Sequence, residues 1–470
     1  MKISFYGGAG KVTGSNFLVE GLKEKILVDC GLEQGSDLGV AEMYGPFPYD
    51  AKTIRALVVT HAHLDHIGRI PKLVREGFGG KIYMTPPTRD LVELILRDSV
   101  NILSEEARRL GRDPLYEDQD VDRALSLIET LEYHTEREVT SGFSIHFCNT
   151  GHVLGSASVR IKDLPAGKAG EDGTSIAFTG DIGNSPSPFL PNWEPIKDAD
   201  TIVMESTYGD RLHPLQQRRV EILAETLKRA VTRGGAILIP AFSLERTQLM
   251  LYELSNFFDA GTLPRVPVFL DSPLAIKVTD VYEKWGPTYF KPEAEDEIKR
   301  EGSIFDFPFL TKTPLRIDSG EIEGTPNPKI IIAGAGMSHG GRIGHWETRY
   351  LPDPSTTLII VGYQAPGSPG RRMAEGASNV RLGGHNVRIR AKTEILEGWS
   401  AHADRDELLK FVEENLPQKG GAVKTIFTAM GEPGAERFLA QRIHDYLGAR
   451  AIVPEMGQTW EITKDSVKLI

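Results

Sequence analysis

Cysteine is nearly absent from this sequence. Its 470 residues include two cysteines, Cys30 and Cys148, and each stands near the end of an apolar run. Two such residues exclude a framework of disulfide bonds of the kind that small secreted domains need. The scarcity predicts free, buried thiols and a reducing compartment, so we expect a cytoplasmic protein.

Long apolar runs and an excess of positive charge are also missing. No stretch approaches the roughly 20 apolar residues that span a membrane, and the first eight residues read as a short strand entering a glycine turn, not as a signal peptide. Asp and Glu (65) outnumber Lys and Arg (54), which gives a net charge of −11. This negative net charge argues against non-specific binding of nucleic acid over the protein surface, but it does not exclude a local basic cleft or a metal centre.

Potential metal ligands are concentrated in residues 60–68, Thr-His-Ala-His-Leu-Asp-His-Ile-Gly. The preceding apolar run, residues 56–59, predicts a buried strand. A single histidine is more often a core or surface residue than a ligand. Crowded imidazoles and carboxylates, however, each need a hydrogen bond or a metal when buried. The segment therefore predicts a metal site on a loop at a strand end, with the ligand types His61, His63, Asp65 and His66.

Other potential ligands also follow apolar runs directly: Asp29, His152, Asp181 and Glu205. For any one of them, a structural role such as a turn cap is at least as good an explanation. The repeated placement at strand ends indicates one cleft rim built from several loops. Six other histidines lie in no ligand pattern and are expected to be structural or exposed, and His339 is left open: His134, His146, His213, His345, His385 and His444.

The alternation of strand and helix patterns predicts an α/β fold. A helix is expected over residues 67–76 and a long one over 88–110. From about residue 211 the pattern changes to a second α/β unit of parallel type, with a loop-rich connection over 291–328. The glycines of loop 334–342 would let backbone amides approach an anion such as phosphate, and an ordinary flexible loop is an equally good explanation.

With these motifs laid out, the whole chain resembles the metallo-β-lactamase superfamily and, within it, the β-CASP nucleases. Residues 61–66 match the superfamily's metal motif, and Asp29, His152 and Asp181 fall at its other signature positions. Glu205 and His402 match the first two β-CASP motifs. Further segments are similar to bacterial and archaeal RNA-cleaving members, relatives of the nuclease of the cleavage and polyadenylation specificity factor: residues 240–246, 270–273, 336–337, 361–364 and 371–372.

This resemblance implies the architecture. The metallo-β-lactamase domain is an αββα sandwich built from both ends of the chain, and the β-CASP domain, also α/β, is inserted into it. The expected limits are residues 1–210 for the first part of the metallo-β-lactamase domain, 211–391 for the β-CASP domain and 392–470 for the C-terminal part.

The resemblance also implies a catalytic centre with two zinc ions. His61, His63 and His152 would hold the first zinc, and Asp65, His66 and a bridging Asp181 the second. A hydroxide oriented by Asp65 would attack the phosphodiester, His402 held by Glu205 would be the general acid, and Asp29 would orient the metal loop. Substrate contacts are expected at Ser243, Arg246, Gly336 and Ser338, although Ser243 would equally suit a helix N-cap and Arg246 the surface.

One residue departs from the family pattern. RNA-cleaving relatives carry a histidine before Gly-Glu in the third β-CASP motif, and Met430 stands there. A thioether is a poor zinc ligand, so Met430 weakens the expected second zinc site.

The resemblance as a whole implies a zinc-dependent endoribonuclease acting on single-stranded RNA, with 5′ exonuclease action as an addition. The alternatives are a DNA nuclease of the same family and a catalytically weak RNA-binding scaffold. A homodimer follows by analogy with relatives only, and no membrane partner is expected.

Overall fold

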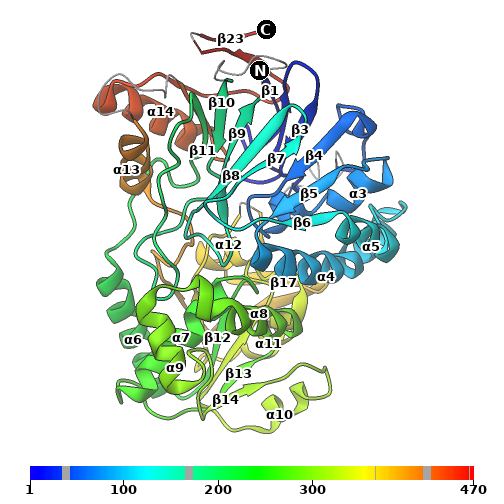
Figure 1. Ribbon diagram of the computed structural model, residues 1–470. Coiled ribbons are helices and arrows are strands. Elements are labelled where there is room, and N and C mark those ends of the chain that lie inside the picture. The colour runs from blue at the N-terminus through cyan, green and yellow to red at the C-terminus, as the bar shows by residue number, and fades with distance from the viewer. Residues whose placement is uncertain (34–42, 165–172, 366, 417–424, 465) are drawn as a thin grey trace. The chain divides into compact units, whose positions relative to one another are not determined.

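The computed structural model describes residues 1–33, 43–164, 173–365, 367–416, 425–464 and 466–470 (Figure 1). Two compact units divide the chain: residues 1–212 with 402–470 form unit 1, and residues 213–401 form unit 2. The domain limits that the resemblance implies, 1–210, 211–391 and 392–470, stay predictions. Within the described ranges, no helix is both long enough and apolar enough to cross a membrane.

Unit 1 contains two sheets. The first has eight strands in the order β23-β22-β1-β2-β3-β4-β5-β6, and their bounds are β1 Lys2–Gly7, β2 Asn16–Glu20, β3 Lys25–Val28, β4 Ile54–Val58, β5 Lys81–Met84, β6 Ile128–Thr130, β22 Thr459–Ile462 and β23 Val467–Leu469. The second has seven strands in the order β21-β20-β11-β10-β9-β8-β7, with the bounds β7 Glu136–Thr140, β8 Phe143–Asn149, β9 Ala157–Asp163, β10 Ser175–Phe178, β11 Thr201–Glu205, β20 Thr425–Ala429 and β21 Ala451–Ile452. Strands from the C-terminal segment join both sheets, as the resemblance implies.

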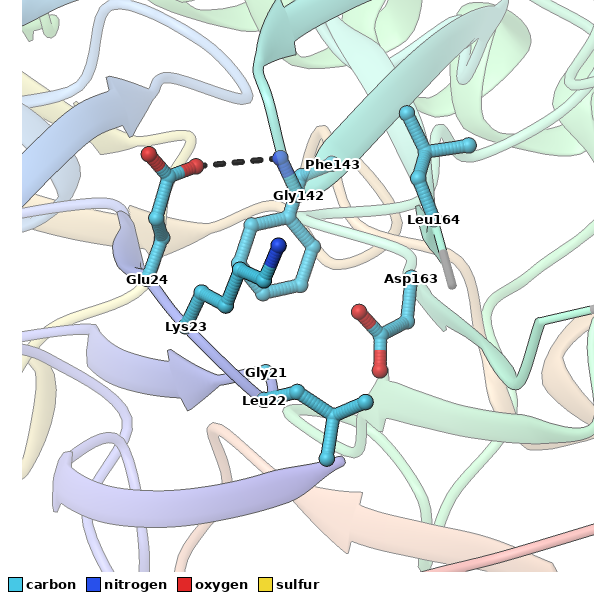
Figure 2. A pocket seen from close by; sticks show the side chains of 8 residues that line it. All are labelled: Gly21, Leu22, Lys23, Glu24, Gly142, Phe143, Asp163 and Leu164. Carbon is cyan, nitrogen blue, oxygen red and sulfur yellow. Dashed lines mark hydrogen bonds between the residues drawn. The ribbon is translucent and has the colours of Figure 1, made fainter. Parts of the chain in front are cut away.

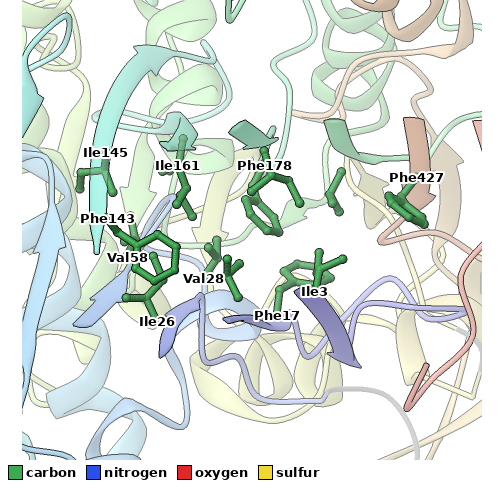
Figure 3. Close-up of a cluster of buried hydrophobic side chains, with 14 of the residues drawn as sticks. Ile3, Phe17, Ile26, Val28, Val58, Phe143, Ile145, Ile161, Phe178 and Phe427 are labelled. Atoms are coloured by element: carbon green, nitrogen blue, oxygen red, sulfur yellow. The ribbon is translucent and has the colours of Figure 1, made fainter. Parts of the chain in front are cut away.

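The two sheets pack face to face through one apolar core (Figure 3). Alternate residues of each strand point inward, so Phe17 and Val28 of the first sheet meet Phe143 and Phe178 of the second. The rings of Phe17 and Phe178 have centroids 5.5 Å apart. Burial of such large side chains is the dominant favourable term in folding, and it fixes the strand ends that carry the candidate site.

Helices cover the outer faces of both sheets, which confirms the predicted αββα sandwich (Figure 1). The helices of unit 1 are η1 Ala51–Thr53, α2 Leu64–Ile67, α3 Ile70–Arg75, α4 Pro86–Leu110, α5 Asp118–Ser126, α13 Arg405–Asn415 and α14 Pro433–Leu447. Helix α4 begins where the Thr85 hydroxyl accepts the Thr88 N–H and ends at Gly111, whose φ of 65° is left-handed. Helices α13 and α14 pack on the second sheet through Leu408, Phe411, Leu439 and Ile443.

Unit 2 is a parallel α/β sheet in the order β14-β13-β15-β12-β16-β19, with the separate hairpin β17-β18. The strands are β12 Ala236–Pro240, β13 Val268–Leu270, β14 Leu310–Lys312, β15 Lys329–Ala333, β16 Thr357–Ile360, β17 Asn379–Leu382, β18 His385–Arg388 and β19 Lys392–Ile395. The helices are α6 Gln216–Arg233, α7 Arg246–Asp259, α8 Pro273–Tyr289, α9 Pro292–Glu301, α10 Ser319–Gly324, α11 Gly341–Tyr350 and α12 Pro369–Ala374. The prediction of a second, parallel α/β unit is confirmed.

Two local predictions were wrong. The expected loop-rich connection over residues 291–328 contains α9, α10 and the edge strand β14, because Pro292 starts a helix and Leu310–Lys312 pairs with β13. The expected helix over 67–76 starts earlier, at Leu64, and is interrupted at Gly68–Arg69. Asp65 and His66 therefore lie on a helical turn and not on an open loop.

Candidate metal centre

The candidate metal ligands stand at the ends of strands in both sheets of unit 1. Asp29 follows β3 directly, and residues 61–66 follow the neighbouring parallel strand β4. His152 follows β8 and Asp181 follows β10, while Glu205 is the last residue of β11. Packing of the two sheets brings these ends together, and this is the arrangement that the strand-end pattern predicted.

Four side chains converge on one point: His61, His63, His152 and Asp181. The Nδ1 atom of His63 is 3.1 Å from His61 Nε2 and 3.2 Å from His152 Nε2. The Oδ2 atom of Asp181 is 3.3 Å from His61 Nε2 and 3.4 Å from His152 Nε2. Zinc bonds of about 2.0–2.1 Å place tetrahedral ligand atoms about 3.3–3.4 Å apart, so these residues fit a zinc ion closely.

The protonation states suit metal binding as well. Burial lowers the pKa of His63 and of His152 well below the usual value, so both imidazoles are neutral, which is the ligand form. Burial raises the pKa of Asp181, but the charges of His66 and His61 outweigh burial and hold it well below the usual range. An ionised carboxylate thus faces three ring nitrogens at a buried point.

His66 extends the cluster toward a second ion. Its Nδ1 lies 2.7 Å from Asp29 Oδ2, so Nδ1–H donates to the carboxylate and Nε2 points to the cluster, 3.5 Å from Asp181 Oδ1. This Nε2 is buried and has no hydrogen-bond partner among the described residues. Burial lowers the pKa of His66, but Asp181 and Asp29 raise it to about 10. The carboxylates therefore favour a positive charge here, which either a proton or a metal ion can supply.

Asp29 orients both the metal loop and His66. Its Oδ1 accepts the Thr60 N–H at 2.8 Å, and its Oδ2 accepts the Thr60 hydroxyl at 2.9 Å. Thr60 was not singled out in the sequence, although its place immediately before His61 is the signal that would have identified it. Asp29 contacts the loop and one ligand, so its position supports the orienting role that the resemblance implied.

Asp65 is held close to the cluster by a tight backbone contact. A side-chain carbon at Gly31 would lie 1.5 Å from the Asp65 carbonyl oxygen, so this position requires glycine. Burial raises the pKa of Asp65, with His66 opposing and Asp181 reinforcing the shift. The charges of His66 and Asp181 thus act on the Asp65 carboxyl group.

His402 and Glu205 form a pair at the edge of the cluster. His402 Nδ1 lies 3.0 Å from Glu205 Oε2 and 3.9 Å from Asp181 Oδ2, and the Ile182 N–H donates to Glu205 Oε1 at 2.5 Å. Burial lowers the pKa of His402, but Glu205 and Asp181 raise it to about 9. Asp181, Glu205 and His402 also lie close enough together to hold a metal ion themselves, which gives His402 two possible roles.

Met430 directly follows β20 and is buried, with 1% of its surface exposed. Its φ of 51° is unusual for a residue other than glycine, and its N–H donates to Gly8 O at 2.6 Å. The side chain belongs to the core between the two sheets, where its Cγ would lie 3.0 Å from a side-chain carbon at Gly8. In this chain the position therefore serves packing.

The expected substrate contacts lie in unit 2, near the C-terminal ends of β12, β15 and β16, where ligands of parallel sheets usually bind. A side-chain carbon at Gly334 would lie 3.7 Å from Ser243 Oγ, and one at Gly336 would lie 2.7 Å from the Phe242 ring. A side-chain carbon at Gly362 would lie 3.9 Å from Arg246 Nε. Ser243, Arg246 and Gly336 are thus neighbours around Phe242. The N-cap position of α7 is Glu245, so the N-cap role considered for Ser243 was wrong.

Ser338 differs from the other three expected contacts. Its side chain is 2% exposed, and its hydroxyl donates to Glu347 Oε1 at 2.5 Å. A contact of Ser338 with substrate would therefore have to use its backbone. In the structure this hydroxyl is a hydrogen-bond partner of the buried Glu347 carboxyl group. Burial raises the pKa of Glu347 to about 8.

Glu347→Gln should make the stability of the protein less dependent on pH. The unfolded chain loses the Glu347 proton above about pH 4.5, whereas the native state keeps it until about pH 8. The native state thus binds more protons in this window, so the free energy of unfolding falls as pH rises through it. The amide does not titrate, and we expect it to remove roughly 1–3 kcal/mol of this fall. Urea unfolding at pH 5 and pH 8 measures the change in the free energy of unfolding between these two pH values, and Glu323→Gln, at an exposed position, is the control. An equal change in Glu347→Gln and wild type would contradict the prediction.

A hollow elsewhere in unit 1 carries none of the candidate site residues (Figure 2). It is lined by residues 21–24, 142–143 and 163–164, and the Gly142 N–H donates to Glu24 Oε2 at 3.0 Å. It lies where β3 begins, whereas Asp29 stands where β3 ends. The hollow is therefore separate from the metal cluster.

Three family models match successive parts of the chain. The metallo-β-lactamase superfamily matches residues 9–135, the Beta-Casp domain residues 247–373, and the Zn-dependent metallo-hydrolase RNA specificity domain residues 386–454. These matches cover parts of both compact units.

Similar curated proteins extend over nearly the whole chain. Ribonuclease TTHA0252 of Thermus thermophilus is 35% identical over 413 residues, which are 88% of this chain and 91% of the relative. An RNase J-like protein of Methanocaldococcus jannaschii is 32% identical, covering 90% and 91%. Transcription termination factor FttA of Methanosarcina mazei is 30% identical, covering 95% and 69%. A crystal structure of a protein of unknown function from Enterococcus faecalis matches 97% of this chain and 99% of its own at a TM-score of 0.55 and 12% identity, which indicates a shared fold.

Proposed function

The chain belongs to the β-CASP family of the metallo-β-lactamase superfamily, and from this premise we propose that it is a zinc-dependent ribonuclease that hydrolyses phosphodiester bonds of single-stranded RNA. Endonucleolytic cleavage is its main activity, and 5′ exonuclease action is an addition. The names of the relatives, a ribonuclease and an RNase J-like protein, support RNA as the substrate.

One observation carries the proposal. His63 Nδ1 and Asp181 Oδ2 each lie 3.1–3.4 Å from the Nε2 atoms of His61 and His152, and the His402–Glu205 pair stands beside them. A metal centre alone would suit many hydrolases. A histidine paired with a carboxylate at its edge adds a proton donor for a leaving group, which phosphodiester cleavage needs.

Each residue of the cluster has a separate role in this proposal. His61, His63, His152 and Asp181 would hold one zinc ion, and Asp65, His66 and Asp181 the other. When bound, two such ions neutralise charge on the phosphate and lower the pKa of water to about 7. Asp65 would orient the attacking hydroxide. Nδ1–H of His402 donates to Glu205, so the opposite nitrogen of the ring, Nε2, carries the proton for the leaving oxygen.

In unit 2, phosphate groups of the RNA backbone would be bound by Ser243, Arg246 and the backbone at Gly336. Arg246 is 5% exposed and heads helix α7. A guanidinium group can fork two phosphate oxygens, and Gly336 leaves no side chain between its backbone and a ligand. Glycine at 336 is also required by the Phe242 ring, which would lie 2.7 Å from a side-chain carbon at this position.

Purified protein with zinc should cleave end-labelled single-stranded RNA and leave single-stranded DNA of the same sequence intact. Internal fragments in the time course report endonucleolytic cleavage, and mononucleotides released from a 5′-monophosphate end report exonuclease action. Cleavage of the DNA alone would replace the proposal by a DNA nuclease. Binding of RNA without cleavage of either polymer would replace it by a scaffold.

Met430→His should strengthen the second zinc site. We expect its zinc affinity to rise by about tenfold or more, because the variant restores the imidazole that the family pattern has at this position in place of a thioether. Zinc titration of the metal-free protein measures this, with the exposed Met456→His as control. Thermal unfolding of the metal-free variant checks that the core around Gly8 tolerates the imidazole. Equal second-site affinities in a folded variant would exclude Met430 as the weak point.

A further inference from the structure

A second group of potential metal ligands lies on β8 and beside it. His134, His146 and Cys148 each offer a ligand atom, and these atoms all lie within 4.8 Å of one another. They are separate from the His61 cluster: β8 carries His146 and Cys148, and His134 precedes the edge strand β7. Their spacing in the sequence gave no indication of a common site.

The strand geometry explains why these side chains meet. His146 and Cys148 are two residues apart, so they share one face of β8, opposite the face whose Ile145 and Phe147 enter the core between the sheets. The His134 N–H donates to Phe147 O at 2.9 Å. His134 also has a left-handed backbone with a φ of 60°, which is uncommon for a residue other than glycine. The fold thus holds its imidazole beside that of His146, with ring centroids 6.3 Å apart.

Glu194 supplies a fourth potential ligand. Its Oε2 lies 3.4 Å from His134 Nε2. The residue is fixed to the end of β8, because its N–H donates to Asn149 O at 2.9 Å and its Oε2 accepts the Asn149 N–H at 3.3 Å. Two imidazoles, a thiol and a carboxylate are a donor set that suits zinc, and four protein ligands form a closed site of structural type.

The environment favours a bound cation. The Nδ1 atom of His146 is buried and has no hydrogen-bond partner among the described residues, and such orphaned atoms are rare in native proteins. Burial also lowers the pKa of His146, which keeps the imidazole neutral and able to bind metal. The neighbouring positive charge of Arg160 is offset by Glu136, whose Oε2 lies 2.7 Å from Arg160 Nη2.

The distances allow closure around an ion. Zinc bonds of about 2.0–2.3 Å need ligand atoms about 3.3–3.8 Å apart. The ligand atoms of His134, His146 and Cys148 lie within 4.8 Å of one another, so they must draw together by at most about 1.5 Å. Glu194 lies outside that group and would reach the ion beside His134. His134 can make this adjustment because its side chain is 62% exposed. Burial raises the pKa of the Cys148 thiol to about 11, so the thiol loses its proton only when a cation binds.

We propose that His134, His146, Cys148 and Glu194 form an additional metal site that takes one divalent transition-metal ion of the zinc type. The ion cross-links the segment before β7, strand β8 and the segment around Glu194. The segment around Glu194 also binds Asn149, because Asn149 Nδ2 donates to Asn192 O at 2.9 Å. Asn149 lies three residues before His152. The site therefore stiffens the start of the loop that carries a ligand of the main cluster.

Cobalt substitution tests the proposal, because a thiolate bound to Co²⁺ gives a charge-transfer band in the near ultraviolet. The full-length protein is freed of metal and titrated with Co²⁺. We expect the band in wild type and in Cys30→Ser, which removes the other cysteine, and its loss in Cys148→Ser. Absence of the band from Cys30→Ser would overturn the proposal.

Zinc binding provides a second measurement, and its His134→Ala arm does not depend on the cysteines. Wild type should bind one more zinc ion per chain than Cys148→Ser. His134→Ala alters an exposed side chain and should fold normally, and it should lower the affinity of this one zinc by at least about tenfold. The exposed His444→Ala is the matched control and should bind zinc as wild type does. Identical zinc isotherms for His134→Ala and His444→Ala would overturn the proposal even if Cys148→Ser failed to fold.

Discussion

Replacing His402 with alanine should lower the rate of RNA cleavage by about 10²–10⁴-fold while the zinc content stays that of wild type. The ring is held by Glu205 at 3.0 Å and stands 3.9 Å from Asp181 Oδ2. Its pKa of about 9 keeps it protonated at neutral pH, in the form that a general acid needs. Because substrate binding does not depend on this proton, we expect kcat to fall and KM to change little.

The zinc measurement separates the two roles that the geometry allows for His402. Asp181, Glu205 and His402 could together hold a metal ion, and in that case His402→Ala would lose zinc along with activity. A substrate with a good leaving group, such as a nitrophenyl phosphodiester, adds a second criterion, because its leaving oxygen needs no proton. The variant should cleave this substrate nearly as fast as wild type. His444→Ala serves as control, and RNA cleavage at the wild-type rate by His402→Ala would remove His402 from the mechanism.

The metal cluster was predictable because its chemistry is local in sequence. Residues 61–66 carry four potential ligands after one strand, and the strand-end positions of His152 and Asp181 follow from apolar runs that can be read directly. The convergence of these strand ends required the two-sheet packing, which the resemblance to the superfamily implied. Thr60 escaped notice because its contribution is a hydrogen bond to Asp29, a residue 31 positions away.

Other features depend on contacts that no local pattern encodes. The cluster of His134, His146 and Cys148 exists because a left-handed residue before β7 meets the outer face of β8. Ser338 was expected at substrate because of its glycine-rich loop, whereas its hydroxyl is buried against Glu347. Helix α2 starts inside the histidine motif, and the carbonyl oxygen of its Asp65 would lie 1.5 Å from a side-chain carbon at the distant Gly31. Each of these depends on tertiary packing, which overrides the local preferences that sequence patterns report.

Asp181 should be the residue whose loss affects both metals. Its Oδ2 faces His61 and His152 at 3.3 and 3.4 Å, while its Oδ1 faces His66 at 3.5 Å. Asp181→Asn keeps the shape of the side chain but removes the negative charge that two cations would share. We expect zinc affinity to fall by at least about 10–100-fold and cleavage by at least about 10²–10³-fold.

A matched control separates this effect from the general cost of changing a buried carboxyl group. Asp163→Asn alters a buried aspartate at the end of β9, beside the hollow that carries none of the site residues. It should bind zinc and cleave RNA as wild type does. If excess zinc restores cleavage to Asp181→Asn, the defect lies in metal affinity, whereas a zinc-loaded but inactive variant would assign Asp181 to the reaction itself. Wild-type zinc affinity in Asp181→Asn would contradict the bridging role, because a carboxylate shared by two cations cannot lose its charge without weakening both sites.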